Sequence, residues 1–382
     1  MTEFANHFDQ IIDRTNTAST KWEKFAPEVL PMWVADMDFA APSFILDGLR
    51  KRLDHPILGY TTRPDSLNLA FCNWLEHHFN WQIDPEWVVW IPGVVPGLNL
   101  SAQLLDKTAK LIIPTPVYHP FLDLAEHAQM SHALVPSYAD SEGLWQWNWP
   151  GFEASNPQTQ DMVMICNPQN PTGRVYTESE LQQLAAFVKT NKLLLVSDEI
   201  HANFVLDNTC QHHCIANLCP DIAAHTISLF AATKIYNIPG VSAAAAVIPD
   251  AALRERFLQA RRGIVSSIGP LGFVASELAF SDRSSWVQEL NQYLSTNLAL
   301  IQSAFPDRLQ RLQATYLAWL DVTDLVSKFS EGGAEAYFAE FGIGISPGAQ
   351  FGDERYIRLN FGCPKKTLEE GLNRLKTALS SP

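Results

Sequence analysis

The central part of the chain alternates short apolar runs with segments that have the periodicity of amphipathic helices. Each run is four to six residues long and is bounded by polar residues or turn formers, which is typical of buried strands. The runs are Lys110–Ile113, Met162–Cys166, Leu193–Ser197, Thr226–Phe230 and Ala243–Ile248. After the second run, Thr177-Glu178-Ser179-Glu180 has the form of a capping box and predicts a helix to about Lys189. This alternation predicts a mostly parallel sheet with helices on both faces, the α/β class.

The pattern changes at about Ser285. A long helical pattern covers Trp286–Phe305, two strand-like runs follow at Tyr316–Val322 and Tyr356–Leu359, and a last helix is predicted near Leu368–Leu379. This order predicts a smaller α+β domain after the large α/β domain.

The first forty or so residues contain Pro, Trp and Asp without clear periodicity, so we expect an arm that packs on the rest of the chain. The predicted organisation is an arm at 1–47 that contributes to the small domain, a large domain at 48–285 and a C-terminal small domain at 286–382. A chain of 382 residues is long enough for two cores.

Composition narrows the range of partners. Hydrophobic residues make up 47% of the chain and charged residues 18%, which excludes extensive disorder. The formal net charge of −14 repels nucleic acid and anionic membranes, so we expect neither as a partner. The start, Met1 to Gln10, does not resemble a signal peptide, and the most apolar stretch, Val241–Ile248, is too short to span a bilayer. A cytoplasmic protein is therefore expected.

The cysteines indicate no disulfide framework. They are Cys72, Cys166, Cys210, Cys214, Cys219 and Cys363. The close spacing of Cys210, His212, His213, Cys214 and Cys219 allows a zinc site, but the usual Cys-x-x-Cys pair is absent. We therefore interpret the cysteines as ordinary thiols and expect no metal.

Polar side chains follow three of the predicted strands. Asn170 lies in the Asn-Pro loop after the second apolar run, Asp198 directly follows the third, and Lys234 comes soon after the fourth. Alone, each has an ordinary reading, as a turn, a helix cap or a surface lysine. In open α/β sheets, however, ligands bind outside the carboxyl ends of the strands. The separations of 28 residues from Asn170 to Asp198 and 36 from Asp198 to Lys234 therefore predict one shared site.

These residues belong to a longer series of motifs that resembles the fold-type-I pyridoxal-phosphate (PLP) superfamily, the class I/II aminotransferases. Within it the chain is similar to the cystathionine β-lyase branch of the MalY/PatB type. The segments that carry the resemblance are Phe8–Arg14, Lys21–Trp22, Leu30–Phe39, His55–Tyr60, Pro92–Pro96, Thr115–Tyr118, Asn167–Arg174, Ser197–His201 and Arg358–Pro364. The resemblance implies a seven-stranded, mostly parallel sheet between helices, with the cofactor bound by the large domain.

The resemblance also implies a role for each residue at the cofactor. Lys234 would form a Schiff base with the cofactor aldehyde and later act as a base. Asp198 would pair with the pyridine nitrogen and keep it protonated, which makes the ring an electron sink. Asn170 would donate a hydrogen bond to the phenolic oxygen, and His201 would lie near the same oxygen.

Further cofactor contacts follow from the same resemblance. Tyr118 matches the aromatic residue that stacks on the ring. The backbone N–H groups of Val94 and Val95, at a helix N-terminus, would bind the phosphate. Tyr60 resembles the tyrosine that relatives offer to the phosphate from a second subunit, which implies a homodimer.

One departure from the family pattern lies beside the lysine. Relatives usually have Ser or Thr three residues before it, and here that residue is Ala231, so Thr233 is the remaining hydroxyl donor to the phosphate. One such charge-assisted hydrogen bond contributes roughly 1.5–3 kcal/mol, so weaker cofactor binding is expected.

Substrate recognition is expected at Arg358, Trp33 and Ala35. Arg358 resembles the arginine that binds the substrate α-carboxylate, for which a planar guanidinium is suited. Trp33 and Ala35 would belong to the part of the arm that covers the substrate.

The resemblance implies a PLP-dependent carbon–sulfur β-lyase that cleaves cystathionine or related L-cysteine thioethers to a thiol, pyruvate and ammonia. An aminotransferase of L-amino acids needs the same lysine, aspartate and arginine, so it stays as the alternative. The loss of a hydroxyl at Ala231 keeps a third reading open, a catalytically weak homologue that acts by binding a partner protein.

Overall fold

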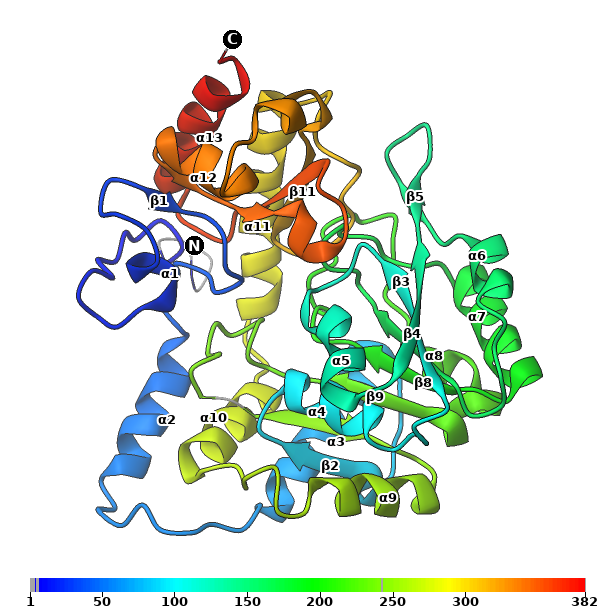
Figure 1. Cartoon of the computed structure of the whole chain (residues 1–382). Helices are drawn as coiled ribbons and strands as arrows, with labels where there is room; N and C mark the ends of the chain where they lie inside the picture. The colour runs from blue at the N-terminus through cyan, green and yellow to red at the C-terminus, as the bar shows by residue number, and fades with distance from the viewer. Residues whose placement is uncertain (1–3, 5–6, 242, 382) are drawn as a thin grey trace.

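The computed structural model describes residues 4, 7–241 and 243–381, which form two layered parts joined by the N-terminal arm (Figure 1). Residues 1–3, 5, 6, 242 and 382 lie outside the described residues. The expectation of a polar start at Met1 to Gln10, and one position of the apolar stretch Val241–Ile248, therefore fall partly outside them. In the part of the chain that is described, no helix has the length and apolar character needed to cross a membrane.

A seven-stranded sheet forms the centre of the large part, in the order β2-β10-β9-β8-β7-β3-β4. Its strands are β2 (Val88–Ile91), β3 (Lys110–Thr115), β4 (Ser131–Pro136), β7 (Met162–Cys166), β8 (Leu194–Asp198), β9 (Thr226–Phe230) and β10 (Ala244–Val247). All neighbouring pairs are parallel except the two made by β10. The expectation of a mostly parallel seven-stranded sheet is confirmed.

Helices cover both faces of this sheet, because successive side chains of a buried strand point to opposite sides. On β7, Met162 and Met164 pack into one core, whereas Val163 and Ile165 pack into the other. The first face is covered by α4 (Val94–Ala102), α5 (Pro120–Ala128) and α9 (Ala251–Arg261). The second is covered by α6 (Trp149–Ala154), α7 (Glu178–Asn191), α8 (Ile215–Leu218), α3 (Asp65–Phe79) and α10 (Pro270–Phe280), and α2 (Ser43–Leu53) packs on α10.

The predicted capping box is present at the start of α7. Thr177 Oγ1 accepts the backbone N–H of Glu180, and the Glu180 carboxylate accepts the backbone N–H of Thr177. Glu180 also pairs with the buried Arg174 at 2.7 Å. The helix start is thereby tied to the loop that carries Asn170.

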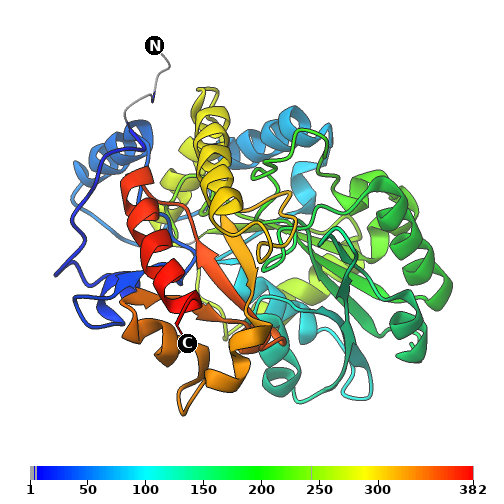
Figure 2. The ribbon, with the colours of Figure 1, turned by 90° about the horizontal axis from the view of Figure 1, so that it is seen from above.

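The C-terminal quarter of the chain, from Trp286 onward, forms the smaller α+β part. Its three-stranded sheet has the order β11-β14-β13, and a parallel two-stranded pair joins β1 of the arm to β12. The elements are β1 (Leu30–Pro31), β11 (Leu317–Asp321), β12 (Ile343–Gly344), β13 (Ser346–Pro347), β14 (Tyr356–Asn360), α11 (Trp286–Ala304), α12 (Gly333–Glu340) and α13 (Lys365–Leu379). Figure 2 shows α11 and α13 side by side over the sheet. Short elements complete the chain: α1 (Thr20–Glu23), β5 (Tyr138–Ala139) and β6 (Trp145–Gln146).

Candidate active site

A cavity of about 340 Å³ lies where the carboxyl ends of the central strands meet the arm and the small domain. The structure brings together almost every residue that the sequence singled out. Those that line the cavity are Trp33, Ala35, Val94, Val95, Tyr118, Asn170, Asp198, His201, Thr233, Lys234 and Arg358. The exception is Tyr60, which does not line the cavity and whose side chain is fully exposed in a segment without regular secondary structure.

Lys234 lies in the turn after β9 and reaches toward the arm. Its Nζ donates a hydrogen bond to the backbone carbonyl of Ala35 at 2.8 Å. Burial lowers the pKa of this amine to about 8, with a further contribution from Arg358, while the charges of Asp36 and Asp198 oppose the shift. A substantial fraction of the amine is therefore unprotonated slightly above neutral pH, as a nucleophile or base requires.

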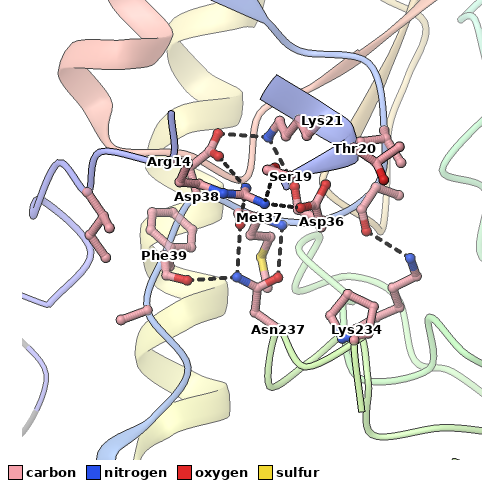
Figure 3. Close-up of a pocket in the computed structure, with 16 residues that line it drawn as sticks. Arg14, Ser19, Thr20, Lys21, Asp36, Met37, Asp38, Phe39, Lys234 and Asn237 are labelled. Carbon is pink, nitrogen blue, oxygen red and sulfur yellow. Dashed lines mark hydrogen bonds and ion pairs between the residues drawn. The ribbon is translucent and has the colours of Figure 1, made fainter. Parts of the chain in front are cut away.

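A second cavity of about 530 Å³ lies on the arm side of Lys234, and Figure 3 shows the charged residues that line it. Arg14 pairs with Asp36 at 2.5 Å and with Asp38 at 2.7 Å, and the buried Lys21 pairs with Asp38 at 2.7 Å. These ion pairs all lie within the arm and fix the local fold of the segment that carries Ala35.

Asn237, three residues after Lys234, binds the arm to the turn that carries the lysine. Its side-chain amide accepts the backbone N–H of Met37 and donates to the carbonyls of Met37 and Phe39 (Figure 3). Arm and lysine turn are therefore one hydrogen-bonded unit.

Asp198 is the last residue of β8 and is buried between its neighbours on β7 and β9. Burial raises the pKa of its carboxyl to about 7, and the charge of Glu199 adds to this. The backbone N–H of Ile200, which donates to Oδ1 at 3.1 Å, and the charge of Lys234 work against the shift. A cationic N–H group in the cavity would stabilise the ionised form of Asp198.

Arg358, in the middle of β14, is a buried cation without a carboxylate partner among the described residues. Its guanidinium donates to Asn170 Oδ1 at 2.9 Å, to the Trp33 carbonyl at 3.0 Å and to Ser346 Oγ at 3.3 Å. Its Cζ lies 4.5 Å from the centroid of the Phe351 ring, and its Nε has no hydrogen-bond partner in the part of the chain that the structure describes. Burial lowers its pKa to about 10. An anionic ligand would supply the missing negative charge.

Two further ring side chains, His201 and Tyr118, line the cavity. His201 is buried, and its Nδ1 has no hydrogen-bond partner among the described residues. Burial and the charges of Lys234 and Arg358 lower its pKa to about 3, so the ring is neutral. Tyr118, after β3, has a raised pKa because it is largely buried, so its hydroxyl keeps its proton. Both are available as hydrogen-bonding groups toward a ligand.

An anion-binding turn lies at the start of α4. Gly93 precedes the helix with a φ of 142°, a conformation that favours glycine. Val94 and Val95 are the first two helical residues, and their backbone N–H groups have no partner within the helix. Pro96, at the third position, has no N–H to offer. Two amides and the helix dipole therefore face the cavity, near Thr233, whereas Ala231 is buried in the core beside α4.

Several cavity residues were not anticipated. His119, Cys166, Ser346 and Gln350 also line the cavity. His119 directly follows the motif segment Thr115–Tyr118 and could have been noted, but Ser346 and Gln350 reach the cavity only through the packing of the C-terminal part of the chain. Tyr316, which donates to the Ala35 carbonyl at 2.8 Å, was likewise missed for that reason.

The cysteine and histidine cluster does not form the five-membered group that its spacing allowed. Among the described residues, only Glu199, His212 and Cys214 bring possible ligand atoms within 4.8 Å of one another. Cys210 instead accepts a hydrogen bond from Gln313.

Comparison with known proteins places this fold and site in a family. The model of the family described as aminotransferase class I and II matches residues 36–375. Cystathionine beta-lyase PatB of Bacillus subtilis is 32% identical over 98% of this chain and 100% of that protein, and Protein MalY of Escherichia coli is 30% identical over 97% and 98%. A solved structure of a PLP-bound C–S lyase from Staphylococcus hominis is 30% identical, with a TM-score of 0.89 over 98% of both chains. The chain belongs to the class I and II aminotransferase family, so the resemblance seen in the motifs is confirmed.

Proposed function

We propose that this protein is a PLP-dependent carbon–sulfur β-lyase that converts cystathionine or related L-cysteine thioethers into a thiol, pyruvate and ammonia. One observation carries the proposal: Lys234, Asp198 and Arg358 line the same cavity, and Arg358 has no carboxylate partner among the described residues. The names of the similar proteins support the lyase reading over other reactions of the family.

The donor set of the cavity fits this cofactor. The Lys234 amine, with its lowered pKa, would react with the cofactor aldehyde, and the buried Asp198 carboxyl would pair with the ring nitrogen. Asn170 and His201 would hydrogen-bond the phenolic oxygen, and the amides of Val94 and Val95, with the Thr233 hydroxyl, would hold the phosphate. When bound, PLP supplies an electron sink for a carbanion at the substrate α-carbon.

The residues of the chain then have separate tasks. Arg358 binds the α-carboxylate of the substrate. Asn170 accepts a hydrogen bond from the guanidinium and so fixes its orientation. Lys234 takes the α-proton at Nζ, after which the thiolate leaves from the β-carbon. The Ala35 carbonyl gives the lysine a fixed resting position between these steps. The remaining three-carbon unit takes up one water molecule and is thereby hydrolysed to pyruvate and ammonia.

An aminotransferase is the second candidate, because the matching family model bears that description. The same lysine, aspartate and arginine serve both reactions. In transamination the α-proton that Lys234 removes would not return to the substrate α-carbon, and the β-substituent would stay attached to the substrate.

A product assay separates the two candidates. The purified chain with added PLP is incubated with cystathionine, an S-alkyl cysteine and ordinary amino acids, and pyruvate and free thiol are measured. We expect equal amounts of both from the thioethers. Conversion of PLP to its amine form, without thiol release, would favour the aminotransferase, and no product from any thioether would contradict the lyase.

We further propose a homodimer in which Tyr60 reaches the phosphate site of the partner subunit. The segment around Tyr60 has no regular secondary structure and exposes apolar side chains: Ile57 is 66% and Leu58 57% exposed. Leu53 and Leu69, at either side of the segment, are also exposed. Exposed apolar side chains in one stretch support an interface between copies.

A further inference from the structure

A buried acid and a buried histidine meet behind Asp198, on the side away from the cavity. Ser197 Oγ donates to Glu199 Oε1 at 2.8 Å, and Nε2 of His212 lies 2.6 Å from Glu199 Oε2. The side chains of Glu199 and His212 are 0% and 2% exposed. In the described part of the chain, no lysine or arginine pairs with Glu199. The Glu199 carboxylate therefore links Ser197 and Glu199, the two neighbours of Asp198 in the chain, to His212.

The loop that carries His212 is fastened to the same strand ends. Asn167, directly after β7, donates from its side chain to the carbonyl of His213 at 3.3 Å, and its backbone N–H donates to the Asp198 carbonyl at 2.9 Å. The edge of the Phe79 ring packs on the His212 ring at 5.4 Å. His212 is thus a rigid partner for Glu199.

Cys214 lies beside this pair, with Sγ 3.8 Å from His212 Nε2, so a metal ion is the competing reading. If Nε2 bound a cation, Nδ1 would carry the proton and need an acceptor. The Nδ1 of His212 is buried and has no hydrogen-bond partner within the described part of the chain. Burial also raises the pKa of the Cys214 thiol well above its usual range, which opposes the thiolate that a metal needs. A His212 N–H that donates to Glu199 leaves no buried donor unsatisfied, and it fits the geometry better.

We propose that Glu199 and His212 form a clamp that positions Asp198 for its contact with the pyridine nitrogen. Neither side chain lines the cavity, so both act through Asp198 and are positioning residues. The inference rests on the proposed cofactor, but it holds for a lyase and an aminotransferase alike. Loss of His212 would leave the buried Glu199 carboxylate with one donor fewer, the Ser197 hydroxyl still being bound, and we expect the strand end beside Asp198 to move to solvate it.

The test measures cofactor binding rather than turnover. Apoprotein of the wild type and of His212→Leu, His212→Gln, His213→Leu and Cys214→Ala is titrated with PLP, and visible circular dichroism of the bound cofactor reports its orientation. We expect His212→Leu to bind about tenfold or more weakly and to change the dichroic band. Gln reaches Glu199 with an N–H donor, so His212→Gln should recover most of the affinity. His213→Leu, in the same loop, and Cys214→Ala should stay within about twofold of the wild type.

Each other outcome contradicts the clamp. Wild-type affinity and dichroism in His212→Leu would overturn it. So would a loss in Cys214→Ala as large as in His212→Leu, together with one zinc per purified chain. If His212→Leu does not fold, the pair His212→Gln and His212→Asn decides, because only Gln reaches Glu199, and equal affinities would overturn the clamp. A wild type that binds no PLP would contradict the proposed function itself.

Discussion

Asp198 shows how one buried carboxyl is prepared for its partner. Burial places its pKa at about 7, so without a cationic partner the ionised form carries a desolvation cost. A pyridinium N–H would offset that desolvation cost and lower the pKa of the Asp198 carboxyl again. The raised pKa is therefore a property of the ligand-free chain that favours binding of a protonated ring.

Replacement of Asp198 by Asn should stabilise the cofactor-free protein in a pH-dependent way. Because the folded pKa lies above the ordinary 3.8, the wild type loses stability as pH rises from about 4 to about 7. Asn cannot ionise and still accepts from Ile200, so the variant should gain about 1–2 kcal/mol over the wild type at pH 8, and less at pH 5.

Calorimetric melting of both apoproteins at pH 5, 6, 7 and 8 measures this. The exposed Asp106→Asn serves as the matched control and should show no such trend. A gain for Asp198→Asn that is independent of pH, or a loss at pH 8, would contradict the assignment.

Some site residues followed from the sequence and others did not. Asn170, Asp198 and Lys234 were placed by strand ends alone, because parallel strands deliver their next residues to one edge. The Ala35 carbonyl that binds Lys234 is a backbone atom on an aperiodic arm, and no side-chain pattern marks it. Ser346 and Tyr316 likewise join the site through contacts between distant parts of the chain.

At the scale of elements, the strands buried on both faces were predicted to within two residues, since a continuous apolar run identifies them. Strand β4 was missed because it lies at the sheet edge and most of its side chains are exposed, so it has no apolar run. Strand β2, at the other edge of the sheet, was also not predicted.

The cap of α7 gives a prediction at this scale. Thr177→Ala removes the side-chain acceptor of the Glu180 N–H and should lower the free energy of unfolding by about 1 kcal/mol. Urea unfolding measures the change, and Gln183→Ala, on the exposed side of the same helix, should be close to neutral. Product formation per folded enzyme should not change, and a loss there would mean that the cap also holds the Asn170 loop.

At the scale of the whole molecule, the division into arm, large domain and small domain at residues 47 and 285, the cytoplasmic location and the homodimer stay predictions. No single-chain pattern fixes them, because each depends on surfaces or surroundings outside one fold. The exposed Tyr60 segment makes the homodimer directly testable.

Two defective variants should complement each other if the site is shared. Lys234→Ala and Tyr60→Ala are each expected to have little activity. In a mixed dimer, one site combines the intact Lys234 of one chain with the intact Tyr60 of the other. Unfolding and refolding an equal mixture should therefore restore about a quarter of the wild-type sites, since half of the dimers are mixed and each has one complete site.

Activity of the refolded mixture, compared with each variant refolded alone, measures the recovery. Activity no higher than the average of the two would show that Tyr60 serves its own chain or none.

The parallel pair between β1 and β12 has a consequence for synthesis of the protein. Leu30 leaves the ribosome early, but its partner Ile343 follows more than 300 residues later. At about 5–20 residues per second, the arm waits roughly 15–60 s before its strand partner exists. During that time the Ala35 carbonyl cannot be held in place against Lys234 by the finished small domain. The nascent chain can therefore complete its large sheet while its catalytic centre is still open, and any product truncated before β12 would be folded in part but chemically silent.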